Sequence, residues 1–340
     1  MDSLIISKKP RLKKPYLIAA WPGMGEVAFK AANYLVEELK AIEFANIKPE
    51  EFFYLSGSAV SKGLLDLPDL PQGKFYYWKN PATRRVATRL GDKNFSGKVA
   101  SNDLIIFLSN AQPDLSKADS YSKIIIGLAK SLKVESVVSF ASMPQATDHN
   151  QESHLWFAAT DKKMKESLNK FNFNELTDGQ ISGMNGLFLA MAKKAGLKGF
   201  CLLGDIPLYT IQIENPKACA AVLEGLGRIL NITINLQPLK DQARSMEVEI
   251  NKLLDYLNLG ASGQSAPIGE EEVELIKKTL SQLTKLPVSV KEKIEKLFEE
   301  SRIDILKANE LKIELDKWNV YKEYEDKFLD LFRKNNDKGN

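Results

Sequence analysis

The chain has 340 residues, of which 44% are hydrophobic and 27% charged, and its formal net charge is +3 at pH 7. This composition is typical of a folded globular protein and argues against intrinsic disorder, while the length predicts two structural units. The small net charge argues against a nucleic-acid-binding protein, and no segment has the ~20 apolar residues in a row that a membrane span needs.

Two features of the sequence favour a cytoplasmic location. The 2 cysteines, Cys201 and Cys219, lie in apolar runs and cannot form a disulfide framework, which indicates a reducing compartment. As buried small hydrophobic residues they need no functional role. The basic stretch at 8–14 is followed by no apolar segment of the kind found in a signal peptide.

Short apolar runs alternate with amphipathic stretches over the first 236 residues. In chain order, strands are predicted at 16–20, 74–79, 104–108, 137–140, 155–159 and 200–203, and helices at 27–39, 121–132, 187–195, 216–230 and 239–257. The alternation predicts an α/β fold, a three-layer α/β/α sandwich whose mostly parallel sheet is covered by helices on both faces.

The helix at 216–230 has the clearest start signal. Asn215 is a favourable N-cap, and Pro216 suits the first helical position because its missing N–H would have no partner there. Behind them, apolar residues recur at the spacing of one helix face.

The chain is predicted to divide into an α/β core at 1–258, a flexible Gly/Ser-rich linker at 259–269 and a charged helical extension at 270–340. The extension has 15 lysines and arginines against 17 aspartates and glutamates, a net charge of −2. Pro287 breaks its helical pattern, and its helices must bury a short apolar stripe at Ile276, Leu280, Leu283, Ile294 and Leu297. Partner-binding coiled-coil helices and a solvated helical hairpin both remain open for this segment.

Gly23, Met24 and Gly25 form a turn between a predicted strand and a predicted helix. The helix N-terminal amides at such a place can hold an anion. The third glycine of a dinucleotide-binding motif and the Gly-Lys-Ser/Thr of a P-loop are both absent. The turn is therefore a weak candidate for an anion site, and tight turning or close packing alone would also explain its glycines.

His149, Glu152 and His154 lie in one polar stretch and are candidates for acid–base chemistry. Their spacing matches no standard zinc motif and no cysteine is near, so we expect neither a metal site nor a cofactor. An ordinary surface loop explains them better. No Gly-x-Ser-x-Gly motif indicates a hydrolase triad.

An aromatic run at 76–78 precedes Arg84, Arg85 and Arg89, a mixture that occurs on nucleic-acid-binding surfaces. The surrounding charge is balanced and aromatic strands usually pack on their neighbours, so we expect no nucleic-acid partner.

Three segments together resemble the proteasome assembly chaperone family, in its archaeal and bacterial branch related to the second chaperone subunit. The resemblance covers roughly residues 15 to 258. It is carried by Trp21-Pro22-Gly23-Met24-Gly25-Glu26-Val27-Ala28, by Ile181-Ser182-Gly183-Met184-Asn185-Gly186-Leu187-Phe188-Leu189 leading to Gly196-Leu197, and by Leu202-Leu203-Gly204-Asp205-Ile206-Pro207-Leu208-Tyr209 followed by Asn215-Pro216-Lys217-Ala218.

The resemblance implies a fold similar to nucleoside phosphorylases, assembly into homo-oligomers that are often trimers, and no known catalytic residues. Some members of the family assemble proteasomes, or bind them through a C-terminal hydrophobic–Tyr–any tripeptide. Because this sequence ends Lys338-Gly339-Asn340, docking of that kind is not expected.

Two functional hypotheses follow. The first is a non-enzymatic, chaperone-like assembly or scaffold protein, whose oligomeric core presents helices to a protein partner. The alternative is a nucleotide- or phosphate-binding enzyme or sensor, with its ligand at Gly23, Met24 and Gly25 and acid–base groups at 149–154. The alternative requires that the loop at 148–154 face this turn across a shared cavity.

Overall fold

The structure, a computed structural model, describes residues 3–54, 57–81, 102–260, 288–303, 307–317 and 321–336. The chain splits into two compact units, Met1–Lys240 and Asp241–Asn340. The second unit therefore begins within a helix that runs on to residue 260, while residues 261–269 of the expected linker lie outside the described residues. The division into core, linker and extension stays a prediction.

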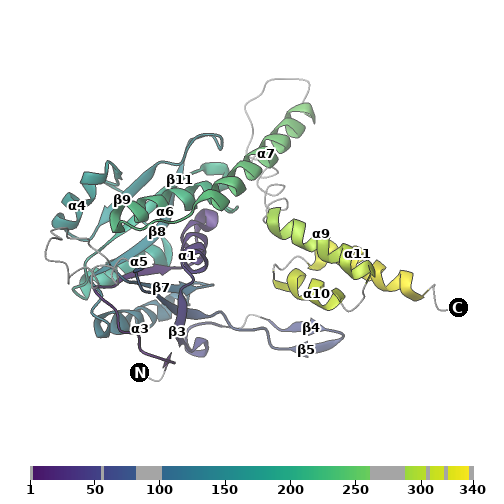
Figure 1. Cartoon of the computed structure of the whole chain (residues 1–340), viewed down its shortest axis with the longest axis horizontal. Coiled ribbons are helices and arrows are strands. Elements are labelled where there is room, and N and C mark those ends of the chain that lie inside the picture. The colour runs from purple at the N-terminus through teal and green to yellow at the C-terminus, as the bar shows by residue number, and fades with distance from the viewer. Residues whose placement is uncertain are drawn as a thin grey trace. The chain divides into compact units, whose positions relative to one another are not determined.

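The first unit contains a nine-stranded sheet in the order β1-β3-β6-β7-β2-β8-β11-β9-β10 and a separate two-stranded sheet, β4-β5 (Figure 1). The strands are β1 Leu4–Ile6, β2 Tyr16–Ala20, β3 Ile42–Ile47, β4 Ala59–Ser61, β5 Leu64–Asp66, β6 Gly73–Trp78, β7 Leu104–Ser109, β8 Ser136–Gln145, β9 Leu155–Ala159, β10 Asn174–Glu175 and β11 Gly199–Pro207. Each of the six predicted strands is present. The mixed α/β fold is confirmed.

The expectation of a mostly parallel sheet is wrong. The central strands β7, β2, β8 and β11 pair in parallel. The pairs β1–β3, β3–β6, β6–β7 and β11–β9 are antiparallel. The pair β9 and β10 is parallel as well, so four of the eight neighbouring pairs in the sheet are parallel and four are antiparallel.

Helices cover both faces of the nine-stranded sheet. The helices of the first unit are α1 Val27–Glu38, α3 Ala118–Ser131, α4 Lys162–Leu168, α5 Gly183–Lys194 and α6 Pro216–Leu230. Alternate residues of β2 point to opposite faces, because the side-chain period of a strand is two. Ile18 and Ala20 pack in the core beneath α1 and α6, whereas Leu17 and Ala19 pack in the core beneath α3 and α5.

The start of α6 forms as its sequence predicts. Asn215 Oδ1 accepts a hydrogen bond from the Ala218 amide at 2.9 Å, and Pro216 occupies the first turn. Leu223 and Leu226 on the inner face are fully buried. These contacts confirm the predicted cap and the predicted apolar face.

The second unit contains most of α7 Gln237–Gly260 and the helices α9 Val288–Ile303, α10 Lys307–Lys317 and α11 Tyr321–Asn336 (Figure 1). These last three helices share a small core made of Ile294, Leu297, Phe298, Ala308, Leu311, Leu315, Phe328 and Leu331. The predicted burial of Ile294 and Leu297 is confirmed. The remaining residues of the predicted stripe, Ile276, Leu280 and Leu283, lie outside the described residues. Within the described part of the chain, no helix is long and apolar enough to cross a bilayer.

Candidate functional site

The turn that follows β2 requires a glycine at one of its two glycine positions. Gly25 has a φ of +62°, and a Cβ added there would lie 3.2 Å from Ile206 Cδ1. Its amide donates to the carbonyl of Ile211 at 2.8 Å, and its carbonyl accepts from the Asn215 amide at 2.9 Å. Gly23 has an extended backbone with φ −165°, and a Cβ there would meet its nearest neighbour at an ordinary 3.4 Å. The predicted need for glycine is confirmed at Gly25.

Asn185 on α5 binds both backbone groups of Trp21, the residue that follows β2. The Trp21 amide donates to Asn185 Oδ1, and Asn185 Nδ2 donates to the Trp21 carbonyl, both at 3.0 Å. The amide side chain thus satisfies both backbone groups of a buried residue, as a neighbouring strand would. The Trp21 ring packs between Phe107 and Phe188, with ring centroids 5.4 and 5.3 Å away. This contact fixes α5 against the sheet.

Gln112 makes a second link between the same elements. Its Nε2 donates to the Pro22 carbonyl at 2.8 Å, and its Oε1 accepts from the Met184 amide at 3.2 Å. The polar backbone groups of the turn are therefore used to join β2, α5 and the segment that follows β7.

The electrostatics at the start of α1 do not favour an anion. Burial raises the pKa of the Glu26 carboxyl, while Lys30 lowers it and Glu214 raises it further. Lys30 Nζ is itself in an ion pair with Glu214 at 2.6 Å. The amides of Gly25 and Glu26 donate to protein carbonyls, so they do not face an open site as phosphate-binding amides do.

A small cavity of about 220 Å³ opens at the carboxyl ends of the central strands, where α/β proteins commonly bind ligands. Gly23 and Met24 line one side, and the β8 residues Ser142 and Met143 line another. Ser142 Oγ donates to the Met24 carbonyl at 2.8 Å. The segment 178–182 completes the lining, which includes no residue of 148–154. This cavity is therefore not one that the turn shares with the loop at 148–154.

A larger groove of about 620 Å³ lies beside this cavity and shares the segment 179–182 with it. We call it the α5 groove. Its apolar lining comes from α5, from β9 and from the flanking loops, and consists of Leu115, Ala158, Ala159, Leu176, Ile181, Met184, Leu187, Leu189 and Ala190. Leu115 is 86% exposed and Leu187 is 39% exposed. Lys193 is the charged residue of the lining, among the residues described.

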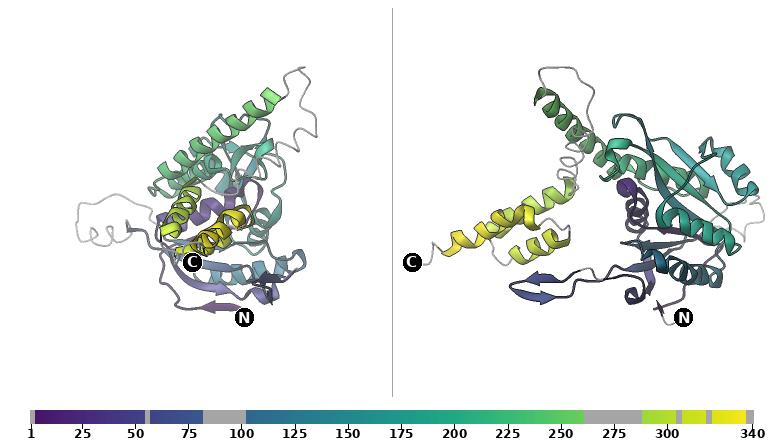
Figure 2. Two further views of the ribbon diagram at one scale, coloured as in Figure 1. Left: turned by 90° about the vertical axis from the view of Figure 1, so that its right-hand side faces the viewer. Right: turned by 180° about the vertical axis from the view of Figure 1, so that it is seen from behind.

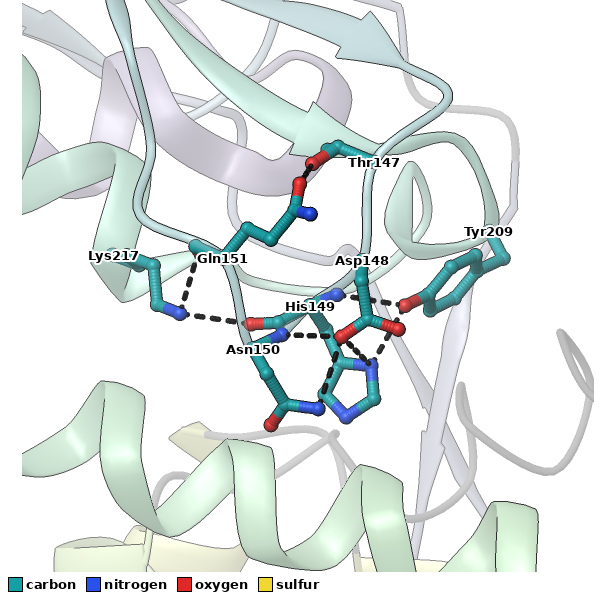
Figure 3. Close-up of polar contacts among 7 residues, drawn as sticks. All are labelled: Thr147, Asp148, His149, Asn150, Gln151, Tyr209 and Lys217. Atoms are coloured by element: carbon teal, nitrogen blue, oxygen red, sulfur yellow. Dashed lines mark hydrogen bonds and ion pairs between the residues drawn. The ribbon is translucent and has the colours of Figure 1, made fainter.

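His149 belongs to a tightly tied loop (Figure 3). Its ring is buried, its Nδ1 lies 2.7 Å from Tyr209 Oη, and its amide donates to the same oxygen at 2.9 Å. Burial raises the pKa of Tyr209, and the amide hydrogen bond lowers it. Tyr209 Oη thus accepts the His149 amide proton and lies within hydrogen-bond distance of its ring.

Lys217 holds the same loop from the start of α6. Its Nζ donates to the carbonyls of His149 and Gln151 at 2.8 and 2.9 Å (Figure 3). The Asn150 amide donates to Asp148 Oδ1 at 2.8 Å and lowers the pKa of that carboxyl. Every one of these contacts orders the loop, which indicates a structural role for it.

His154 lies in a different environment. Its side chain is 68% exposed, and its Nδ1 is 3.1 Å from Oδ2 of the buried Asp205. Asp205 Oδ1 also accepts from Trp156 Nε1 at 2.6 Å. Glu152 is exposed. The two histidines therefore have different partners: His149 lies near Tyr209 Oη and, at 3.6 Å, Asp148 Oδ1, whereas His154 lies near Asp205.

Both cysteines are buried thiols. Burial raises the pKa of Cys201 to about 12 and raises that of Cys219 as well. A thiol that resists ionisation is a poor nucleophile, so the expected structural role fits.

The aromatic run on β6 packs inside the protein. Tyr77 contacts Phe44 with ring centroids 5.9 Å apart, and Tyr76 and Trp78 pack against the core on the other face. Arg84, Arg85 and Arg89 lie outside the described residues.

The β4–β5 hairpin is an exposed apolar element that the sequence did not reveal. Figures 1 and 2 show it as a narrow ribbon leaving the nine-stranded sheet between β3 and β6. We call residues 59–69 the arm. Its turn residues, Lys62 and Gly63, both have positive φ, the geometry of a two-residue hairpin turn. Four apolar side chains of the arm are 69–78% exposed, namely Val60, Leu64, Leu65 and Leu67.

The contacts of several residues with structural roles cannot be predicted from the local sequence. The motifs that carry the family resemblance include Asn185, Asp205, Tyr209 and Lys217. The resemblance therefore indicates that these positions matter, but it does not show which residues they contact. The local sequence around Gln112 does not predict its role, because its hydrogen-bond partners at Pro22 and Met184 are distant in sequence.

Comparison with solved structures shows the same fold in other proteins. Pyrococcus furiosus PbaB, described as an archaeal proteasome activator, matches with a TM-score of 0.60 at 23% identity, over 74% of this chain and 99% of PbaB. Pyrococcus furiosus PbaA, described as an archaeal homolog of proteasome-assembly chaperone, matches with a TM-score of 0.53 at 23% identity, over 76% of this chain and 98% of PbaA.

Sequence comparison adds two relatives, both uncharacterized proteins of Methanocaldococcus jannaschii. One is 34% identical over 128 residues, which make up 37% of this chain and 48% of the relative, so the match spans about half of that protein. The other is 22% identical over 259 residues, 75% of this chain and 92% of the relative.

The family assignment follows from a match over most of the chain. Residues 17–254 match the sequence profile of the PAC2 family, and this range contains Gly25, Asn185, Tyr209 and Lys217, whose contacts hold the strand ends and loops in place. The resemblance to proteasome assembly chaperones inferred from three short motifs is thereby confirmed: the chain belongs to the PAC2 family.

Proposed function

We propose that this chain is a chaperone-like assembly or scaffold protein that acts by binding other protein chains. The observation that carries this proposal is the arm, whose four apolar side chains are more than two-thirds exposed. Clustered apolar side chains on a protruding element mark a site of protein interaction. The descriptions of PbaB as a proteasome activator and of PbaA as a homolog of proteasome-assembly chaperone support the same class of function.

The finer features of the proposal concern assembly and location. We propose a cytoplasmic homo-oligomer, with a trimer as its state, built on a core that is similar to nucleoside phosphorylases. The helices α9, α10 and α11 would form an extension that binds the partner or caps the oligomer. Their shared core supports an independent helical module. The partner is a protein, and no nucleic acid, membrane or cofactor is part of the proposal.

No observation favours the alternative function of a small-molecule enzyme or sensor. Gly23 and Met24 line a cavity to which His149, Glu152 and His154 do not contribute. The amide of Gly25 already donates to a protein carbonyl.

A reconstitution experiment tests the proposed function. The purified chain is mixed with recombinant proteasome subunits from its source organism, and the mixture is analysed by size-exclusion chromatography with light scattering. We expect a co-eluting complex or faster assembly of the subunits into rings. A variant with Leu64→Asp and Leu67→Asp should weaken the effect, while Val248→Asp, at a 51% exposed position on α7, serves as the matched control.

The proposed function would be contradicted if the unmodified chain neither bound the proteasome subunits nor changed their assembly. If calorimetry then showed binding of a nucleotide or of inorganic phosphate, the sensor or enzyme hypothesis would replace this one.

A further inference from the structure

The arm is too small to be stable by itself in water. Val60 and Leu65 are direct cross-strand partners, so their side chains share one face of the hairpin. The hairpin forms its own two-stranded sheet, and isolated two-stranded hairpins are marginal at best in water. Covering this face with apolar surface from another element would stabilise the arm.

The α5 groove is an apolar surface that is concave and open, whereas the arm protrudes. Leu115 and Leu187 are partly exposed on its wall, and the groove extends along α5 beside β9. Grooves of several hundred Å³ with mostly apolar walls are typical binding sites. No residue of the arm is among those that line it.

The charges of the arm and the groove are complementary. The arm contains Asp66 and Asp69 close to Leu67 and Lys62 in its turn, so its net charge is −1. The described lining of the groove contains Lys193 and no carboxylate. The two aspartates of an apolar, weakly acidic segment complement this lysine.

The sheet topology points to a second copy as the source of the arm. The arm connects the second and third strands of the sheet, β3 and β6, whereas the groove extends from Gln112 and Leu115, in the segment after the fourth strand β7, to the eighth strand, β9. With neighbouring strands about 4.8 Å apart, β6 and β9 are separated by roughly 24 Å across the sheet. The arm extends away from the sheet in Figure 1 and in the right-hand view of Figure 2.

We propose that the arm of one copy binds in the α5 groove of a second copy of this chain. Each copy would then give an arm and receive one. Head-to-tail contacts of this kind close into a ring such as the proposed trimer, whereas reciprocal exchange between two copies forms a two-fold pair. The proposal rests on the oligomeric part of the proposed function and identifies the surfaces that make the oligomer.

Single substitutions test each surface. Leu65→Asp changes the arm, and Leu187→Asp changes the groove. Leu115→Asp gives a second groove variant at an 86% exposed position where a charge is compatible with the fold. Val248→Asp is the control outside both surfaces. Circular dichroism and melting temperature establish folding, and sedimentation equilibrium measures assembly. We expect the dissociation constant to rise by about tenfold or more in the arm and groove variants and not in the control.

Mixing two variants makes the test specific. The Leu65→Asp chain keeps an intact groove, and the Leu115→Asp chain keeps an intact arm. Because one complete arm–groove pair remains between them, the mixture should form a 1:1 heterodimer at concentrations below the raised dissociation constants, where each variant alone is monomeric.

Three results would overturn the proposal. If wild type is oligomeric but the arm and groove variants remain so, other surfaces make the oligomer, and the proposed function stands without this contact. If both variants are monomeric but fail to associate when mixed, the two surfaces do not bind each other. A monomeric wild type would contradict the oligomeric part of the proposed function as well.

Discussion

At Gly25, the backbone conformation determines which residue the turn accepts. The left-handed conformation at φ +62° costs about 1–2 kcal/mol for a residue with a Cβ, and that Cβ would also crowd Ile206. Gly25→Ala should therefore lower the free energy of unfolding by at least this amount in urea denaturation. Gly23→Ala is the matched control in the same turn, and it should change stability by less than about 0.5 kcal/mol. Equal effects at both glycines would contradict the role assigned to Gly25.

Tyr209 holds the loop at 147–151 through one oxygen atom. Tyr209→Phe removes that oxygen and leaves the buried His149 amide and Nδ1 without this partner. An unsatisfied buried polar group costs about 1–3 kcal/mol. Amide exchange at His149 should accelerate, and the urea midpoint should fall. The control is Tyr54→Phe, at a tyrosine that is 70% exposed. Unchanged exchange at His149 would show that Lys217 alone orders the loop.

At the scale of elements, Asn185 fixes α5 to β2 by satisfying both backbone groups of Trp21. Asn185→Asp preserves the shape and the acceptor but replaces the donor with an oxygen that faces the Trp21 carbonyl. We expect a loss of at least 1–3 kcal/mol in the free energy of unfolding at neutral pH. The control is Asn33→Asp on α1, where Nδ2 donates to the exposed Glu37 carboxylate and the new like-charge pair should cost only about 0.2–0.5 kcal/mol. A neutral effect at Asn185 would mean that packing of the Trp21 ring suffices to place α5.

The elements that the sequence predicted are those whose pattern repeats over many residues. The central strands and α1, α3, α5 and α6 are long and bury a continuous face, so their periodicity is strong. The strands β1, β3 and β10 were missed because they are short or interrupted by polar residues such as Glu43 and Asn46. Their pairing comes from the neighbouring strand, which local sequence does not contain.

At the scale of the whole molecule, the two cores of the α/β unit include no residue beyond Leu239 among those described, and α9–α11 have a core of their own. A chain cut after Gly263 should therefore keep its melting temperature within about 2 °C and should remain oligomeric. Differential scanning calorimetry and sedimentation equilibrium measure both properties. If the shortened chain unfolds or dissociates, residues beyond 263 are part of the core or of its interface.

The sequence by itself determined the α/β class, the cap of α6, the need for glycine in the turn after β2, and the family. Each of these depends on signals within a short stretch of chain, such as periodicity, a capping residue or a backbone conformation that only glycine adopts easily. The tertiary structure alone decided the direction of the edge strands, the use of Asn185 and Tyr209 as clamps, the separation of His149 from the cavity at Gly23, and the exposure of the arm. Those features depend on which distant residues become neighbours, and a local pattern does not contain that information because packing brings them together only when the sheet forms.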